Sequence, residues 1–353
     1  MDTVSQAALG VFTTDALCRR ALGPKNIAIG MAAGILPDLD VIVPQLVELV
    51  GGNFYLSYLA THRTWSHSLV TAPALAMLFA AGCKKFPPFR QLKLLPLFLA
   101  TWLAFITHIL LDLCTSYGIE LFWPLSRHRF ALFWVPEIDL FFLPLLIMLL
   151  LLILVQNFRR RRSTKLSWIG LGAFCGYIAF GALMHQVVWQ RFERSEMMAN
   201  GFSNNVHRQV FPHLGSLLVW RAVEISDDKL KIARFDFGGN QSSAVHEIAN
   251  HVDEIPEWLQ ASPEYATMRH ATSSFLWVQR DSTAQNEEQF EMQDVRFALS
   301  PDDPNGLIAI AARRGPLGTM HCEVKSWYLG KTFLKERSYA QATAQLWQNI
   351  LGE

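Results

Sequence analysis

Residues Leu140–Val155 have the sequence LFFLPLLIMLLLLILV, which contains no charged side chain and is followed by the basic run Arg159–Arg162. An apolar helix of roughly 20 residues crosses the hydrocarbon core of a bilayer, and a basic run beside it marks a cytoplasmic end. The alternative interpretation is a buried helix in the core of a large soluble protein. Because the segment is uncharged and ends in a basic stop, we predict a membrane span at Ile138–Gln156.

Four further apolar segments share this character. Leu94–Cys114 and Leu166–Trp189 are long enough to span a bilayer, and Leu69–Cys83 is shorter. Asn26–Val50 is also apolar but is interrupted by the motif Pro37-Asp38-Leu39-Asp40. Carboxylates facing lipid are costly, so we expect these two to face protein or a wet cavity.

Basic residues flank the apolar segments on one side only. They form three groups: Arg19, Arg20 and Lys25; Lys84, Lys85, Arg90 and Lys93; and Arg159–Arg162 with Lys165. The positive-inside tendency places these loops in the cytoplasm. Following the chain from them sends Asp38, Asp40 and the C-terminal end of Leu94–Cys114 to the opposite surface. The N-terminal twenty residues lack the order of a cleaved signal peptide, so we expect a short retained helix there.

The chain changes character after Trp189. Alternating segments predict strands at Trp220–Ile225, Lys229–Phe237, Phe275–Arg280, Phe290–Leu299 and Leu307–Arg313, and a closing helix at Lys331–Leu351. We therefore predict an α-helical polytopic membrane domain at residues 1–189, followed by a soluble α+β domain at residues 190–353. The expected location is a bacterial inner membrane, with the C-terminal domain outside the cytoplasm.

Composition excludes some partners and site types. The 353 residues carry a net charge of +1, which does not favour nucleic acid or a polyanionic substrate. The five cysteines form neither a CxxC zinc motif nor a disulfide framework. Membrane lipids are the expected partners, and the sequence does not indicate a protein partner.

One candidate metal-ligand pair lies on an apolar helix. His108 and Asp112 are four residues apart, so both side chains project from one helix face about one turn apart. Imidazole with carboxylate suits zinc, manganese or iron. The alternative is an intramembrane hydrogen bond that joins two helices.

A second cluster lies at the start of Leu69–Cys83. His62 and His67 would offer two nitrogen ligands beside Arg63, near a helix N-terminus that favours anions. Ser66 alone could be an ordinary N-cap. With His108, Asp112 and the Asp38/Asp40 motif, the set contains three histidines and three acids where charge is expensive. We therefore predict one metal site, with one or two ions.

Three segments resemble, in their order along the chain, the signature blocks of the LexA-regulated, membrane-bound metal-dependent hydrolases, the YdjM-like family. They are PDLD, HRTWSHS and THILLDLCTSYGIELFWPLSRHRFAL. The resemblance covers roughly Ala8–Leu143. It implies that the metal-site residues are Asp38, Asp40, His62, His67, His108 and Asp112, with Arg63 and Arg127–Arg129 lining the site. It does not supply a substrate.

The resemblance implies a metal-dependent hydrolase. Because the predicted site lies at the membrane surface and would meet molecules concentrated there, we expect cleavage of an ester, phosphoester or amide, with a lipid or lipid-linked molecule as one expected substrate. A divalent ion, with zinc expected before manganese or iron, would polarise the scissile bond. Asp40 or Asp112 would accept a proton, and Arg63 would stabilise charge on the substrate oxygen. His128 is a further catalytic candidate, although it could equally belong to an interfacial basic patch. Glu137 and Asp139 are candidate extra ligands.

Two other functions fit the same residues. A metal-dependent transporter or sensor would use the His/Asp set to pass or detect ions, and a structural protein would use the metal to fasten helices. A transporter should carry polar residues at mid-span in several helices. Leu140–Val155 has none, and the candidate ligands gather at one end of the predicted spans, which favours the enzyme.

Overall fold

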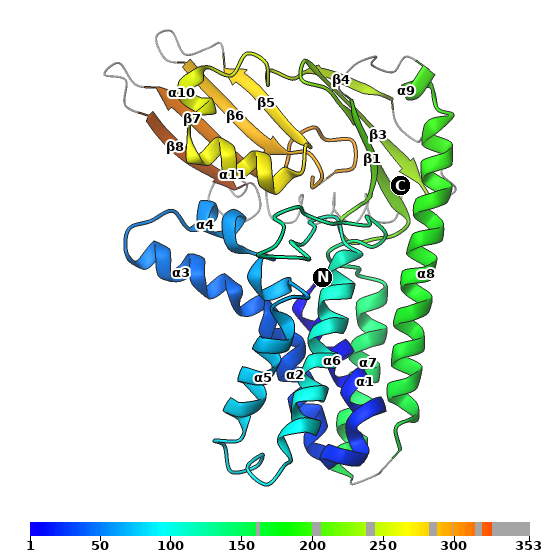
Figure 1. Cartoon of the computed structure of the whole chain (residues 1–353). Helices are drawn as coiled ribbons and strands as arrows, with labels where there is room; N and C mark the ends of the chain where they lie inside the picture. The colour runs from blue at the N-terminus through cyan, green and yellow to red at the C-terminus, as the bar shows by residue number, and fades with distance from the viewer. Residues whose placement is uncertain are drawn as a thin grey trace, which may run out of the picture. The chain divides into compact units, whose positions relative to one another are not determined.

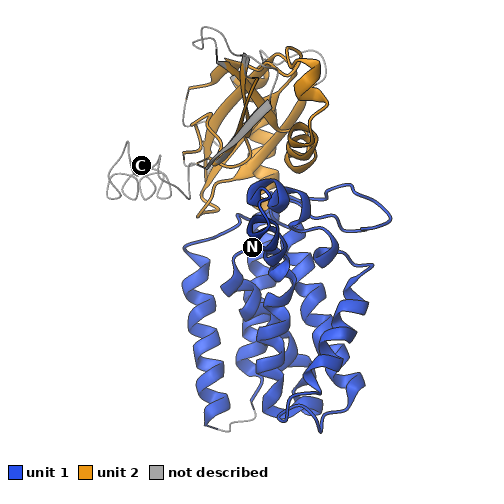
Figure 2. Cartoon of the chain, turned by 90° about the vertical axis from the view of Figure 1, so that its left-hand side faces the viewer, with its two compact units in different colours: residues 1–182 blue, residues 183–353 orange. Residues whose placement is uncertain are grey.

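A computed structural model describes residues 1–159, 163–199, 206–237, 244–281, 288–298, 300–314 and 320–326. The chain forms two compact units, Met1–Ala182 and Leu183–Glu353, which Figure 2 colours separately. The boundary lies inside a long helix, slightly before the predicted boundary at Trp189. The predicted helix at Lys331–Leu351 lies outside the described residues.

Unit 1 is helical (Figure 1). Its helices are α1 Thr3–Leu22, α2 Asn26–Ile35, α3 Ile42–Leu49, α4 Phe54–Thr61, α5 Ala72–Cys83, α6 Leu94–Leu113, α7 Phe142–Phe158 and α8 Lys165–Glu193, which continues into unit 2. Three 3₁₀ turns, η1 Gly23–Lys25, η2 Leu36–Val41 and η3 Trp65–His67, connect them. The four predicted spans after Leu69 correspond to α5, α6, α7 and α8, and the predicted break at Asp38 is η2.

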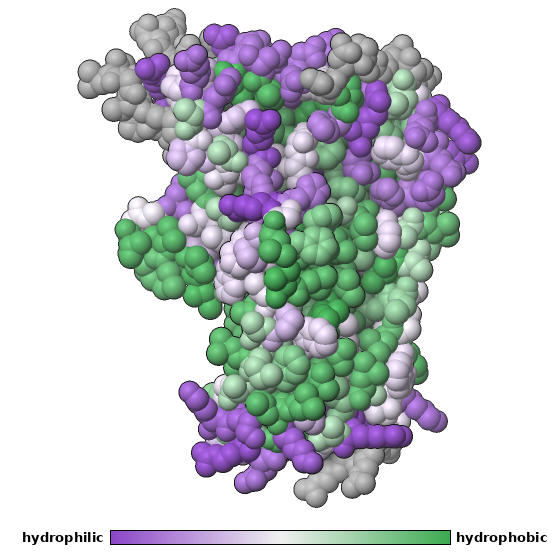
Figure 3. Space-filling model, viewed as in Figure 1, coloured by the Kyte–Doolittle hydropathy of each residue, from purple (hydrophilic) through white to green (hydrophobic). Residues whose placement is uncertain are grey.

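Several of these helices can cross a membrane. The described candidates are Thr3–Leu49, Leu94–Leu113 and Lys165–Glu193; Phe54–His67 with Ala72–Cys83 passes only as a pair bent by 82°. The apolar α7 is shorter. Within Thr3–Leu49 the chain turns back at Gly23, whose φ of 62° is readily adopted by glycine. On the face seen in Figure 3, an apolar belt covers the helices of unit 1 and ends below in a polar rim.

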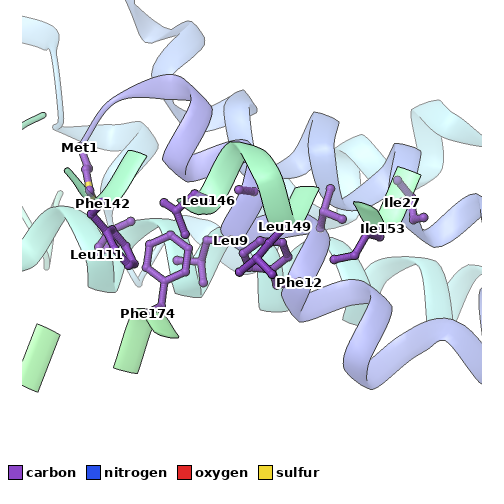
Figure 4. Close-up of a cluster of buried hydrophobic side chains, with 12 residues drawn as sticks. Met1, Leu9, Phe12, Ile27, Leu111, Phe142, Leu146, Leu149, Ile153 and Phe174 are labelled. Carbon is purple, nitrogen blue, oxygen red and sulfur yellow. The ribbon is translucent and has the colours of Figure 1, made fainter. Parts of the chain in front are cut away.

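The outward face of α7 argues against the soluble-core alternative. Met148 and Leu151 are 50% and 55% exposed, and Leu145, Leu152 and Val155 are exposed beside them. A soluble protein rarely presents such a contiguous apolar surface to water, whereas a bilayer covers it. The inward face of α7 packs on α1 and α8, where Phe12, Leu146 and Phe174 form part of one buried cluster (Figure 4).

Helices α1 and α2 pack unusually closely through glycine. A Cβ atom on Gly30 would lie 2.1 Å from Thr14 Oγ1 and 2.5 Å from the Gly10 carbonyl oxygen, and one on Gly34 would lie 2.5 Å from the Gln6 carbonyl oxygen. Small residues at such crossings let two backbones approach inside a membrane. This contact brings Gln6 and Gly34 to the end of the unit where η2 begins.

Replacing Gly30 by alanine is expected to destabilise unit 1, because the added methyl group meets backbone atoms that cannot rotate away. Overpacking of this kind costs about 1–3 kcal/mol. Thermal unfolding of the detergent-purified protein measures the loss. Gly172→Ala on α8 is the matched control, since nothing lies within 4 Å of its added Cβ atom. Equal unfolding temperatures for the two variants would contradict the close α1–α2 contact.

Unit 2 contains two antiparallel sheets, each with its strands in chain order. The first has β1 His207–Pro212, β2 Val219–Ile225, β3 Lys229–Asp236 and β4 His246–Ala249; the second has β5 Leu276–Asp281, β6 Glu288–Asp294, β7 Ile308–Arg314 and β8 Met320–Ser326. Short helices α9 Glu196–Ala199, α10 Glu257–Gln260 and α11 Pro263–Thr272 complete the described part. The five predicted strands correspond to β2, β3, β5, β6 and β7, so the predicted fold class is confirmed.

Candidate metal centre

Four of the six predicted ligands converge at one end of unit 1. Each of Asp38, His67, His108 and Asp112 offers one ligand atom, and these atoms lie within 4.8 Å of one another. His67 Nε2 is 3.0 Å from both His108 Nε2 and Asp112 Oδ2, and 3.3 Å from Asp38 Oδ1. The residues come from η2, η3 and the last turns of α6. Segments separated by up to 74 positions therefore build one group.

Helix α6 and its neighbours orient two of these side chains. His108 Nδ1 is 2.7 Å from the Gly34 carbonyl oxygen, which can only accept, so this nitrogen carries the proton and Nε2 is left as a donor to a metal. Asp112 Oδ1 accepts from Gln6 Nε2 at 2.8 Å and contacts the α-amino nitrogen of Met1. Its other oxygen, Oδ2, therefore faces the histidines.

Asp40 orients the third side chain through a buried hydrogen-bond network. It accepts bonds from the Arg63 backbone N–H at 2.9 Å and from Ser66 Oγ at 2.6 Å, and His62 Nδ1 lies 2.8 Å from its other oxygen. Ser66 Oγ is in turn 2.9 Å from His67 Nδ1. Because the serine proton goes to Asp40, His67 Nδ1 donates to Ser66 and its Nε2 is free to bind a metal. Asp40 and His62 thus lie around the four-ligand group and outside it.

The four-ligand group suits a cation. Its two imidazole Nε2 atoms are 3.0 Å apart although each ring has its other nitrogen engaged, and two lone pairs so close repel without a positive charge between them. Asp112 Oδ2 is buried and has no hydrogen-bond partner among the described residues. Two imidazoles with two carboxylates make a donor set that zinc accepts in tetrahedral geometry. The residues present therefore fit a divalent metal ion.

The helical unit also matches a known family. The profile of the YdjM inner membrane protein family matches residues 1–188, which is more than half of the chain. The chain belongs to this family. No curated protein and no solved structure matches it. Membership of the YdjM family supports an inner-membrane location. The matched residues include all four candidate ligands, whereas most of unit 2 lies beyond them.

Arg63 lies against the acidic side of the group in this YdjM-family chain. Its Nε is 3.1 Å from Asp112 Oδ2 but is not aligned for a hydrogen bond, and its two terminal nitrogens donate to Thr115 Oγ1 at 3.0 Å and Glu137 Oε2 at 3.1 Å. The Tyr117 ring packs on the guanidinium, with its centroid 5.2 Å from Cζ. The predicted contact of Arg63 with a substrate oxygen stays a prediction.

The Arg63 backbone adopts a left-handed conformation, with φ of 58°. This conformation is uncommon for a residue with a long side chain and is held by surrounding contacts. The Arg63 N–H donates to Asp40, and its carbonyl oxygen accepts from the Glu120 N–H at 3.0 Å. The turn directs the arginine side chain and the His67 ring to the same four-ligand group.

Glu137 and Asp139, the two candidate extra ligands, have different surroundings. Burial alone would raise the pKa of Glu137, but the Arg63 guanidinium outweighs this effect, so the pKa is lowered and the carboxylate stays charged at neutral pH. Asp139 accepts from the backbone N–H groups of Phe141 and Phe142, both at 2.9 Å, at the start of α7. Its other oxygen accepts from Tyr177 Oη at 2.9 Å, so Asp139 acts as a helix cap.

Within the Arg127–Arg129 stretch, Arg129 supports the segment next to the site, whereas His128 lies at the surface. Arg129 is buried and donates to the carbonyl oxygens of Leu59 and His62 at 3.3 Å and 3.1 Å, which fixes the chain just before Arg63. His128 is exposed, and its ring packs against Phe130 at a centroid distance of 4.6 Å. Within the described chain, His128 makes no contact with the four-ligand group, which fits the interfacial alternative better than a catalytic role.

Two residues that complete the centre were missed in the sequence. Gln6 holds Asp112, and the Gly34 carbonyl holds His108. The sequence shows a glutamine in an apolar segment and a glycine three residues before Pro37. Neither residue type indicates a metal site by itself.

Proposed function

We propose that this protein is a membrane-bound metal-dependent hydrolase with one divalent ion held by Asp38, His67, His108 and Asp112. Zinc fits this donor set best, and manganese and iron also bind such ligands. The observation that carries the proposal is the four-ligand group itself, in which Asp38 is partly exposed while the other three members are buried, so a substrate would reach the group from the side of Asp38. A purely structural ion is normally enclosed by its ligands.

The ion, when bound, would supply Lewis acidity that polarises a scissile ester, phosphoester or amide and lowers the pKa of water. The residues of the chain would set the geometry of the ligands and the charge around the ion. Asp40, through Ser66, fixes the ring of His67, and Arg63 brings a permanent positive charge beside Asp112. Asp40 already accepts three hydrogen bonds, which suits an orienting role; its predicted part in proton transfer stays a prediction.

The position of the group supports a lipid or lipid-linked substrate over a small soluble one. The ligands lie at the end of α6 and in η2 and η3, so they lie near one surface of the apolar belt. Molecules concentrated at that surface meet the group first. The transporter alternative is less well supported because α7 contains no polar side chain between Leu140 and Val155.

Hydrolysis by the detergent-purified protein tests the proposal. The protein is stripped with a chelator, reloaded with zinc, manganese or iron, and assayed on p-nitrophenyl esters, phosphodiesters and phospholipids. Activity should return with one of the metals, while a His67→Ala protein treated in parallel stays inactive. A protein that binds metal through these residues yet cleaves none of the substrates would favour the structural alternative.

The C-terminal domain is expected to lie outside the cytoplasm. Helix α8 begins at Lys165, beside the basic run, and its 29 residues extend about 43 Å, enough to reach the opposite surface. An alkaline phosphatase fusion after Gly201 should therefore be active, and one after Arg159 should not. The reverse pattern would contradict the assigned topology.

A further inference from the structure

The segment that connects Asp38 to His62 forms a short helical hairpin, α3 and α4, at residues 42–61. Each of its helices has eight residues and is about 12 Å long, much too short to cross a hydrocarbon core of roughly 30 Å. The two helices pack against each other, and the turn between them contains Gly51 with φ of 87°. The hairpin lies across the direction of α5 and α6 (Figure 1), consistent with the bend of 82° between α4 and α5.

Helix α3 presents two different exposed faces. Ile42, Leu46 and Leu49 recur at helical spacing and are 45%, 57% and 81% exposed. Gln45 and Glu48 are exposed on the adjoining face, while Pro44 is buried. Exposing this apolar face to water would be energetically unfavourable. A helix at a membrane interface instead places its apolar face in the acyl region and its polar face among the headgroups.

Three further observations point to lipid as the partner. Glu48 is the only charged residue in the hairpin sequence. Helix α4 carries Tyr55, a residue type enriched where acyl chains meet headgroups. In the view of Figure 3, the apolar surface over α3 also lies level with the upper part of the apolar surface over the longer helices, the surface that a bilayer would cover.

We propose that α3 lies in the leaflet remote from the basic loops, parallel to the membrane plane, with Ile42, Leu46 and Leu49 among the acyl chains. The hairpin begins directly after η2, which carries Asp38, and ends at His62 and η3, which carries His67. Its depth therefore sets the depth of the metal centre at the headgroup level. Resting on the proposed function, the substrate is the headgroup end of an amphiphilic lipid that enters beside the hairpin from within the leaflet.

Spin-label accessibility tests the placement of α3. Single cysteines replace Leu46, Leu49, Gln45 or Glu48 in a protein whose five native cysteines have been removed, and each labelled protein is placed in phosphatidylethanolamine–phosphatidylglycerol vesicles. Labels at 46 and 49 should collide mainly with oxygen, which dissolves in the acyl region. Labels at 45 and 48, the matched controls, should collide more with a water-soluble nickel chelate.

Two outcomes would overturn the lipid assignment. Equal access of the nickel chelate to all four labels would place α3 in water. Labels at 46 and 49 that are shielded from both reagents and couple to each other between molecules would place a second copy of the chain on this face.

A kinetic comparison separates this inference from the proposed function. Leu46→Asp should raise KM for a substrate embedded in vesicles and leave kcat and the hydrolysis of a water-soluble short-chain analogue unchanged, while Gln45→Asp changes neither. Labels found in the acyl region of a metal-loaded protein without hydrolysis would support the hairpin and reject the proposed function. Hydrolysis by a protein whose labels at 46 and 49 are exposed to water would support the proposed function and reject the placement of the hairpin in the leaflet.

Discussion

Replacing His108 by alanine is expected to abolish metal binding and hydrolysis together. Its Nε2 is one of four converging candidate ligand atoms, and the contact of its Nδ1 with the Gly34 carbonyl oxygen holds the ring with Nε2 directed at the group. Removing a ligand should weaken the metal affinity by more than the roughly 10–100-fold that loss of an outer-shell partner costs. Metal content per protein after gel filtration, measured by mass spectrometry, and activity on the same sample test the prediction.

His62→Ala is the informative control. His62 contacts Asp40 and stacks on Tyr58 with centroids 4.5 Å apart, but it is not one of the four converging ligands. We expect this variant to keep a metal ion with an affinity reduced by about 10–100-fold. Equal loss of metal from both variants would place His62 in the ligand set, as the sequence motif predicted.

Arg63→Ala is expected to lower kcat by about 10²–10³-fold with the metal retained, the usual cost of removing one group that stabilises developing charge. A bound ion would compensate Asp112, so loss of the guanidinium would mainly remove the arginine partner of Glu137. Steady-state kinetics and metal analysis of one preparation give both quantities.

Arg63→Lys is the matched variant, because it keeps the charge and loses the forked contacts to Thr115 and Glu137. It should recover part of the activity. If Arg63→Ala instead loses its metal, or if both variants hydrolyse substrate like the unchanged protein, then Arg63 only positions Asp112 and the predicted catalytic role is wrong.

Most of the helical unit could be predicted from hydropathy and charge. The segments at α6, α7 and α8 are strongly apolar and form helices where predicted, and the basic loops predict their order across the membrane. The pair His108 and Asp112 could be assigned to one site because four-residue spacing on a helix fixes a shared face. In unit 2, alternation located β2, β3, β5, β6 and β7, but the four-residue β4 is too short to show a period.

The division between ligands and supporting residues could not be predicted. Asp38 and Asp40 are two residues apart in one motif, and only the 3₁₀ turn η2 decides that Asp38 faces the metal centre and Asp40 faces Ser66. The roles of Gln6 and Gly34 depend on the α1–α2 contact, whose closeness comes from glycines distant in sequence. Asp139, a candidate ligand, accepts from the backbone N–H groups of Phe141 and Phe142 at the start of α7 and does not belong to the four-ligand group of the described chain.

X-ray absorption at the zinc edge of the zinc-loaded, detergent-purified protein tests the central claim most directly, because it reports the donor atoms themselves. A centre built by Asp38, His67, His108 and Asp112 predicts two imidazole nitrogens and two oxygens at about 2.0–2.2 Å, with the imidazole signal reduced to one ring in His108→Ala. A sulfur donor at about 2.3 Å, or a spectrum that His108→Ala leaves unchanged, would show that the ion is bound elsewhere and contradict the assigned centre.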